Sequence, residues 1–267
     1  MKLPNLFKGN DDETTTISPK LGTEIKGVQL SELNDAGKDE LALLVSQRGV
    51  LVFRDQDFVS EGPKFLSNYV KYFGETHIQP ASGAPQDQRD IHSVLTGGTS
   101  DDFYAKKNNL VQWHSDGSGD LNPTAISFLT VTNIPATNGG DTIFASNIEA
   151  YERLCPLFKQ KIENLQAYHS AIDQANKAIV KGGYVKRHPA TNTHPVVRTA
   201  PTGRKVLCVD GGFTRKIVGL KDEESNALLK FHLNHISNGH NSASRDVQMI
   251  GEVGVEPHTV ECETFGR

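Results

Sequence analysis

The chain has 267 residues, of which 36% are apolar and 22% charged, enough for one large domain with a packed core. Its net charge of -4 and its lack of lysine- or arginine-rich blocks argue against nucleic-acid binding. No apolar run approaches the roughly 20 residues of a membrane span, and the start of the chain lacks the apolar run of a signal peptide. Cys155, Cys208 and Cys262 form no zinc or disulfide spacing, which favours a reducing, cytoplasmic setting.

The first part of the chain predicts a polar arm followed by alternating helices and strands. Residues 1–18 are polar and are expected to form a flexible arm. Residues 31–49 and 60–74 carry apolar side chains at helical spacing and stop at glycine, so both are predicted helices. Between them, residues 50–56 form a short apolar run typical of a buried strand. Residues 75–109 are rich in Gly, Pro and polar side chains, which is typical of a long binding loop.

The second part of the chain predicts further strands and helices without a regular alternation. Residues 125–134 favour a strand, and residues 147–165 favour one amphipathic helix kinked at Pro156. Residues 171–193 are basic, contain glycine and are expected to be a loop. The runs HPVVRT and RKVLCVD predict a hairpin around the turn APTG, and residues 221–239 predict a last helix. Without a βαβ pattern or a glycine-rich phosphate loop, we expect a β-sandwich decorated by helices.

The stretch WHSD at residues 113–116 carries the first chemical signal. On a strand, His114 and Asp116 would point to the same face, because side chains alternate with a period of two. A histidine, a carboxylate and a second histidine from elsewhere form the facial triad of non-haem iron(II) oxygenases. Taken alone the pair is a weak signal, and two polar residues on a surface turn is the commoner interpretation. Trp113, the only tryptophan, could shield a reactive centre, and the segment GGDT ending at Thr142 could place a hydroxyl near a bound carboxylate.

Longer stretches around this pair follow the order of a known family and together cover roughly residues 19–240. They are GTEIKGVQL, RGVLVFRDQDF, YFGETHIQPASG, WHSD, NGGDTIFASNIEAYERL, HPVVRTAPTGRKVLCVDGGFTRKIVGL and EESNALLKFHLNHISNG. In these motifs the chain resembles the taurine dioxygenase (TauD/TfdA) family of Fe(II)- and 2-oxoglutarate-dependent dioxygenases. Within the family, it is most similar to the fungal branch that resembles sulfonate dioxygenases.

The resemblance implies a mostly β domain with flanking helices, folded as a double-stranded β-helix (jelly roll) over residues 19–260. It implies Fe(II) as cofactor, with 2-oxoglutarate and O₂ as co-substrates. In such an enzyme 2-oxoglutarate is decarboxylated to succinate while a small organic acid is hydroxylated. In the sulfonate branch the hydroxylated product collapses to an aldehyde and sulfite. The implied partner is a small-molecule substrate, with no nucleic acid and no membrane, and a homo-oligomer is left open.

The resemblance also assigns roles to single residues. His114 and Asp116 match the first two iron ligands, and Thr142 matches the hydroxyl that contacts the 2-oxoglutarate carboxylate. His77 and Gln79 fall in the substrate-side loop HIQP. Taurine-type members carry a second histidine where this chain has Gln79, which can donate a hydrogen bond but carries no positive charge. Another sulfonate or a different small acid is therefore open.

The third ligand is not expected within the chain. His194, in THPVVRT, begins a hairpin strand in the family and is expected to be structural. In the family a distal histidine follows a segment like W-x-P-x-x-V-x-x-W-D-N-R, and GVEPHTV at residues 254–260 resembles its start. Residues 261–267 form a divergent tail, so the distal histidine and the arginine that pairs with 2-oxoglutarate are expected beyond Arg267.

Two consequences follow from this ending. The jelly roll is expected to lack its last strands, and a site with two protein ligands would hold iron less well than one with three. His235, His240 and His258 are candidate substitute ligands, although a facial site tolerates little positional error. The alternative to an active dioxygenase is a catalytically inactive, truncated family member. A ligand-binding jelly roll without redox chemistry has less support, because the matching motifs are catalytic ones.

Overall fold

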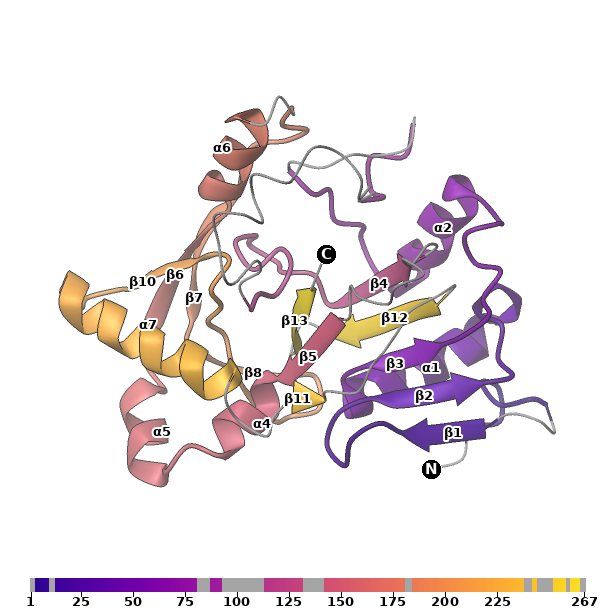
Figure 1. Ribbon diagram of the computed structural model, residues 1–267, viewed down its shortest axis with the longest axis horizontal. Helices are drawn as coiled ribbons and strands as arrows, with labels where there is room; N and C mark the ends of the chain where they lie inside the picture. Colours follow the sequence, from indigo (N-terminus) through magenta and orange to yellow (C-terminus); the bar gives the residue numbers. More distant parts are fainter. Residues whose placement is uncertain are drawn as a thin grey trace, which may run out of the picture.

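Figure 1 shows the computed structural model of the chain. It describes residues 3–9, 13–80, 87–92, 113–131, 142–180 and 184–237, and the backbone of the strands at 242–243, 252–257 and 260–264.

A five-stranded sheet occupies one side of the molecule, in the order β1-β2-β3-β12-β4 (Figure 1). Its strands are β1 (Glu13–Thr16), β2 (Thr23–Lys26), β3 (Leu51–Phe53), β12 (Glu252–Pro257) and β4 (Ile126–Val131). Only β2 and β3 run parallel, and the other pairs are antiparallel. Gly254 of β12 lies opposite both Val52 and Leu129. A strand from late in the chain therefore joins β3 to β4.

Helix α1 (Asp35–Arg48) connects the two parallel strands, as a parallel pair requires. The Asn34 side chain caps its first turn by accepting a hydrogen bond from the amide of Gly37, and Gly49 ends it with a φ of 75°. Its buried side chains include Leu41 and Val45, which join the core beneath the sheet. The helix predicted at residues 31–49 is confirmed, with a short 3-10 turn η1 (Leu30–Glu32) before it.

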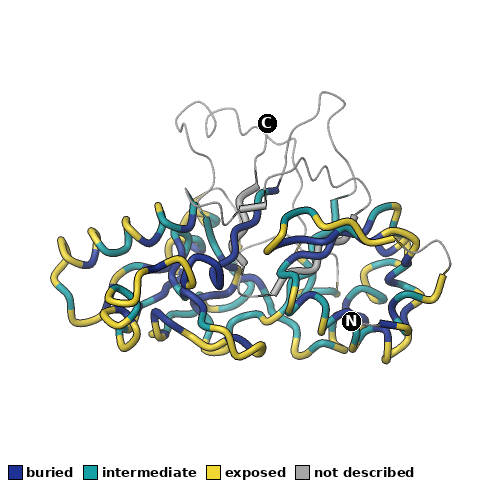
Figure 2. Tube along the Cα trace, turned by 90° about the horizontal axis from the view of Figure 1, so that it is seen from below, coloured by how far each residue is buried: buried dark blue, intermediate teal, exposed yellow. Residues whose placement is uncertain are grey.

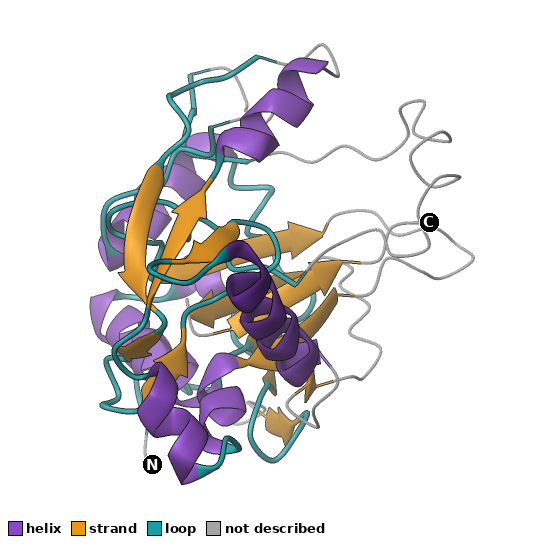
Figure 3. Cartoon of the chain, turned by 90° about the vertical axis from the view of Figure 1, so that its left-hand side faces the viewer, coloured by secondary structure: helices purple, strands orange, loops and turns teal. Residues whose placement is uncertain are grey.

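The other side of the molecule is built from smaller antiparallel sheets and helices. The strands are β5 (Thr142–Ser146), β6 (Gln166–Ser170), β7 (Thr191–Pro195), β8 (Val197–Thr199), β9 (Lys205–Leu207), β10 (Thr214–Ile217), β11 (Ser242–Ala243) and β13 (Val260–Thr264). They form the sheets β10-β6-β7, β11-β5-β13 and β8-β9, of which the last is the predicted hairpin. The helices not yet given are α2 (Pro63–Val70), η2 (Lys71–Phe73), α4 (Asn147–Glu152), α5 (Pro156–Ile162), α6 (Ile172–Val180) and α7 (Asp222–Ser237). Figure 3 shows the strands gathered inside and helices around them.

Two main apolar clusters hold these parts together. One lies under the five-stranded sheet and includes Phe53 and Phe58, and the other lies between α4, α7 and the smaller sheets and includes Leu207 and Ile236. Trp113 is partly buried and packs against the second cluster. Buried residues run through the inside of the trace and exposed ones follow its outer edges (Figure 2). The packing of Trp113 anchors the start of WHSD to the core.

The N-terminal residues differ from the expected flexible arm. Leu3 and Leu6 are buried in the first cluster, and β1 pairs with β2 along its length. The Glu40 carboxylate of α1 accepts hydrogen bonds from the backbone amides of Asn5 and Leu6, both at 2.8 Å. The few apolar side chains among the polar residues are enough to dock this segment, because their burial is combined with these hydrogen bonds.

Two further expectations about helices are corrected by the structure. Residues 147–165 form two helices, α4 and α5, because Pro156 occupies the first turn of α5, where its missing amide proton is not needed. Residues 171–193, expected to be a loop, contain α6, whose Ile172, Ala175 and Ile179 recur at helical spacing. None of the helices in the described ranges is long and apolar enough to cross a membrane.

The end of the chain contributes strands. The sequence leads us to expect that the last strands are missing and that residues 261–267 form a divergent tail. In the structure β12 pairs with β3 and β4, and β13 pairs with β5 from Val260 opposite Ser146 to Thr264 opposite Thr142.

Candidate metal and substrate site

His114 forms an isolated β-bridge and Asp116 begins the turn that follows it, so only the first of the two lies in the extended backbone that we expect from the sequence. Asp116 begins a turn that extends to Gly119, and the carbonyl of Trp113 accepts a hydrogen bond from the amide of Gly211 at 2.8 Å. Nε2 of His114 lies 3.6 Å from Oδ1 of Asp116. The two side chains therefore lie on the same side, although the turn begins at Asp116.

The donor atoms of this pair fit a divalent iron ion. Imidazole nitrogen and carboxylate oxygen are two donors of the facial triad. The two donor atoms lie 3.6 Å apart, and the half-exposed Asp116 side chain has room to turn toward an ion shared with His114. In the ranges that the structure describes, no group of three or more His, Cys, Asp or Glu side chains is close enough to hold a metal.

The loop before β10 supports His114 from behind. Gly212 approaches the ring so closely that a Cβ atom at this position would lie 2.9 Å from the Cβ of His114. Asp210, in the same loop, is 3% exposed and lies near enough to His114 for the two to interact electrostatically. Burial raises the pKa of Asp210, and hydrogen bonds from Ser118 and from the Phe213 amide partly oppose this rise.

A buried polar network continues from Asp210 away from the metal pair. Ser118 donates to Oδ2 of Asp210 at 2.7 Å, and Nδ1 of His169 lies 3.2 Å from the Ser118 oxygen. His169 is fully buried, and burial, followed by the nearby His194, lowers its pKa to about 4. His169 is therefore neutral. The network fixes the turn that begins at Asp116, because its hydrogen bonds hold Ser118, which stands two residues after Asp116.

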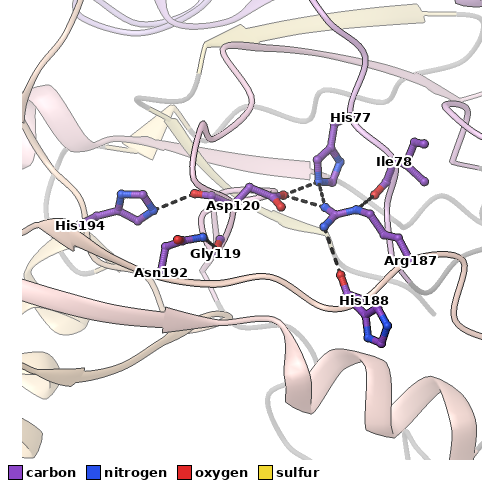
Figure 4. Close-up of polar contacts among 8 residues, drawn as sticks. All are labelled: His77, Ile78, Gly119, Asp120, Arg187, His188, Asn192 and His194. Carbon is purple, nitrogen blue, oxygen red and sulfur yellow. Dashed lines mark hydrogen bonds and ion pairs between the residues drawn. The ribbon is translucent and has the colours of Figure 1, made fainter.

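The substrate-side loop is tied to the same turn (Figure 4). Nε2 of His77 lies 2.7 Å from Oδ2 of Asp120 and 2.7 Å from Nη2 of Arg187. Arg187 Nη2 also donates to Oδ2 of Asp120 at 2.8 Å. Burial raises the pKa of Asp120, but the hydrogen bonds from His77 and Arg187 outweigh it and hold the pKa below its usual value. Gln79 is buried two residues after His77.

The backbone of the same loop is held by the segment that follows α6. Arg187 donates from Nε to the carbonyl of Ile78, and the amide of Lys186 donates to the carbonyl of Pro80 at 2.6 Å. Arg89 in turn donates to the carbonyl of Lys186. These bonds tie the loop to Arg187, 109 residues after Ile78. The loop HIQP therefore has a defined position beside the turn at residues 116–119, to which His77 is joined through Asp120.

The remaining predicted residues lie in different settings. Thr142 is buried at the start of β5, and its role toward 2-oxoglutarate stays a prediction. Nε2 of His194 donates to the carbonyl of Asp120 at 2.8 Å, which suits the expected structural role. Nε2 of His235 donates to the carbonyl of Ala150 at 2.8 Å, so this nitrogen is already used. His240, His258 and the position expected beyond Arg267 lie outside the described residues.

Sequence reasoning missed the residues that support the predicted ones. Asp120 stands four residues after Asp116, and Arg187 lies in the segment noted only as basic. The net basic character of residues 171–193 was the one signal for Arg187. Asp210 and His169 gave no signal, because a buried polar network depends on contacts between distant segments.

The comparisons with known proteins agree with these motifs. Residues 13–248 match the family described as "Taurine catabolism dioxygenase TauD, TfdA family". This match covers most of the chain, and the chain belongs to that family.

Two curated relatives show which branch the chain resembles. It is 41% identical over 248 residues to the "Alpha-ketoglutarate-dependent sulfonate dioxygenase" of Saccharomyces cerevisiae, covering 91% of this chain and 58% of that protein. It is 40% identical over 243 residues to the "Alpha-ketoglutarate-dependent dioxygenase cnsP" of Penicillium expansum, covering 88% and 65%. The chain therefore spans about three fifths of the length of these relatives.

A solved structure shows the same fold. The crystal structure of a taurine dioxygenase from Burkholderia xenovorans superposes with a TM-score of 0.72 at 22% identity, covering 96% of this chain and 84% of that one. At this identity the likeness concerns the arrangement of helices and strands.

Proposed function

We propose that the chain provides the metal- and substrate-binding part of an Fe(II)- and 2-oxoglutarate-dependent dioxygenase. Its substrate would be a small organic acid, with an alkyl sulfonate as the first candidate. The observation that carries the proposal is the His114–Asp116 pair, 3.6 Å apart within the WHSD motif of a family member. The relative from Saccharomyces cerevisiae, named a sulfonate dioxygenase, supports the substrate class.

The residues of the site divide the work between them. His114 would bind iron through Nε2 and Asp116 through a carboxylate oxygen, and the Thr142 hydroxyl would donate to a carboxylate of 2-oxoglutarate. Bound iron and 2-oxoglutarate would supply the activation of O₂. Trp113 would shield the base of the site, because it packs against the core directly before His114 in the chain. His77, with the buried Gln79, would hold the acidic group of the substrate beside the metal. The likeness in fold supports a jelly-roll arrangement of the sheets.

The second candidate function is an inactive family member that binds metal weakly. It is favoured by one observation, the lack of a third metal-binding side chain around the pair within the described ranges. The two candidates differ in turnover and not in the positions of His114 and Asp116.

The deciding experiment measures succinate and sulfite released by the purified chain from 2-oxoglutarate, Fe(II), ascorbate and a panel of small sulfonates and carboxylates. We expect succinate formation that depends on an acid from the panel and disappears in His114→Ala. The exposed His188 contacts Arg187 through its backbone carbonyl, which an alanine keeps, so His188→Ala provides the matched control variant. Metal binding without succinate formation in any mixture would decide for the inactive member.

A further inference from the structure

The His77 ring is held at one edge by two residues of opposite charge. Nε2 is in hydrogen-bonding distance of both Asp120 and Arg187, while the structure gives no hydrogen bond to Nδ1 from any described residue (Figure 4). Asp120 and Arg187 are themselves paired at 2.8 Å, and both side chains are largely buried. Because both contacts are made at Nε2, the opposite edge of the ring, with Nδ1, is left for a ligand.

Asp120 and Arg187, the two neighbours of Nε2, both influence whether Nδ1 carries a proton. When the ring is charged, both nitrogens carry protons, and Nε2 donates to the Asp120 carboxylate, which can only accept. When the ring is neutral, Nε2 can accept from Arg187 Nη2, and the proton then stays on Nδ1. In the charged ring, and in the neutral ring whose Nε2 accepts from Arg187, Nδ1 is a hydrogen-bond donor.

A donor at Nδ1 is what an acidic substrate requires. Sulfonate and carboxylate groups have only acceptor oxygens, so an unprotonated Nδ1 would repel them. A histidine with Asp120 as its only partner would carry its proton on Nε2 when neutral and would lose this donor. Arg187 therefore has a role that Asp120 cannot fill.

We propose that Arg187 and Asp120 are positioning residues for His77, which keep its Nδ1–H directed at the anionic group of the substrate. This inference rests on the proposed function, since it assumes that the substrate is an acid bound near His77. Arg187 acts at the same time on the backbone, because its Nε donates to the carbonyl of Ile78. The residue thus fixes both the position of the loop and the proton of its histidine.

The first test is the tautomer of His77, read from the ring nitrogen shifts of ¹⁵N-labelled protein above the titration midpoint found in the same experiment. We expect the proton on Nδ1 in the unaltered chain and on Nε2 in Arg187→Met. In the control, Arg204→Met, the proton should stay on Nδ1, because Arg204 forms a similar ion pair with Glu149 away from this loop. A proton on Nε2 in the unaltered chain would overturn the inference.

The second test is binding of ethanesulfonate, followed by the fluorescence of Trp113, with Co(II) and 2-oxoglutarate present. We expect Arg187→Met to raise the dissociation constant at least tenfold. Arg187→Lys should rescue little of this loss, because one ammonium group cannot serve Ile78 and His77 together. Asp120→Asn should weaken binding as well, and its effect should not add to that of Arg187→Met if both act through His77.

Co(II) binding, measured on the same samples, separates this inference from the proposed function. All three variants should retain the metal, whereas His114→Ala should lose it. Unchanged ethanesulfonate binding in Arg187→Met, or no binding by the unaltered chain, would overturn the inference and leave the metal assignment standing. If the unaltered chain binds no Co(II), the proposed function itself is contradicted.

Discussion

Gly212 lies so close to His114 that a Cβ atom at position 212 would stand 2.9 Å from the Cβ of the histidine. Gly212→Ala is therefore expected to displace His114, because non-bonded carbon atoms need about 3.5 Å or more. We expect at least a tenfold loss of Co(II) affinity, measured by equilibrium dialysis. Gly37→Ala is the control, since its Cβ would be similarly crowded, 3.0 Å from the carbonyl of Asn5, in the first turn of α1. An equal loss in both variants would point to unfolding.

His114→Ala and Asp116→Ala should each remove a donor from a site in which the two lie 3.6 Å apart. We expect each variant to lose stoichiometric Fe(II) binding, measured with a colorimetric chelator after anaerobic desalting. The Asp116 side chain is half-exposed in the turn, so Asp116→Ala should change the unfolding free energy little, within about 1 kcal/mol. Full retention of Fe(II) by either variant would refute the assignment of that residue.

Two variants of Asp210, Asp210→Asn and Asp210→Ala, are expected to differ in their effects on metal affinity and on the unfolding free energy. The asparagine can still accept from the amide of Phe213 but removes the charge beside His114, so metal affinity should fall about tenfold or more. The alanine also leaves Ser118 without its acceptor in a buried place, which should lower the unfolding free energy by about 2 kcal/mol. Dialysis and urea unfolding on the same samples test both effects. Equal metal affinity in Asp210→Asn and the unaltered chain would contradict the supporting role.

His232 should make the stability of the chain depend on pH. It is fully buried on α7, and burial, with a smaller effect of His235, lowers its pKa from 6.5 to about 4. Its contribution is complete above pH 6.5, where both states are neutral, and is lost as pH falls toward 4, because the unfolded chain then takes up the proton. The loss is about 2 kcal/mol at pH 5.

The variant His232→Leu removes this group with little change in volume. We expect the unfolding free energy, from urea titrations at pH 7.5 and pH 5, to fall by about 2 kcal/mol less in the variant than in the unaltered chain. His169, which has a similarly lowered pKa, remains in both proteins and sets the background. Parallel pH curves for the two proteins would show that His232 is not the group responsible.

Much of the local structure could be predicted from spacing alone. The helix at residues 31–49 and the hairpin around APTG follow from apolar periodicity and from turn residues, which act over a few positions. The sequence predicts one helix kinked at Pro156, whereas the structure has two. Proline disrupts the interior of a helix but is favourable in the first turn, so the residue alone does not distinguish a kink from a new helix.

The sequence alone determined the family, because WHSD and the stretches around it lie in continuous segments whose order can be compared directly. It also supplied His114 and Asp116 as candidate iron ligands and His77 and Gln79 as candidate substrate-side residues. Only the tertiary structure decided that Asp120 and Arg187, 67 residues apart, share one hydrogen-bonded cluster with His77. It also placed Gly212 and Asp210 behind His114. Such contacts depend on how distant segments pack in three dimensions, and no local pattern of residues encodes them.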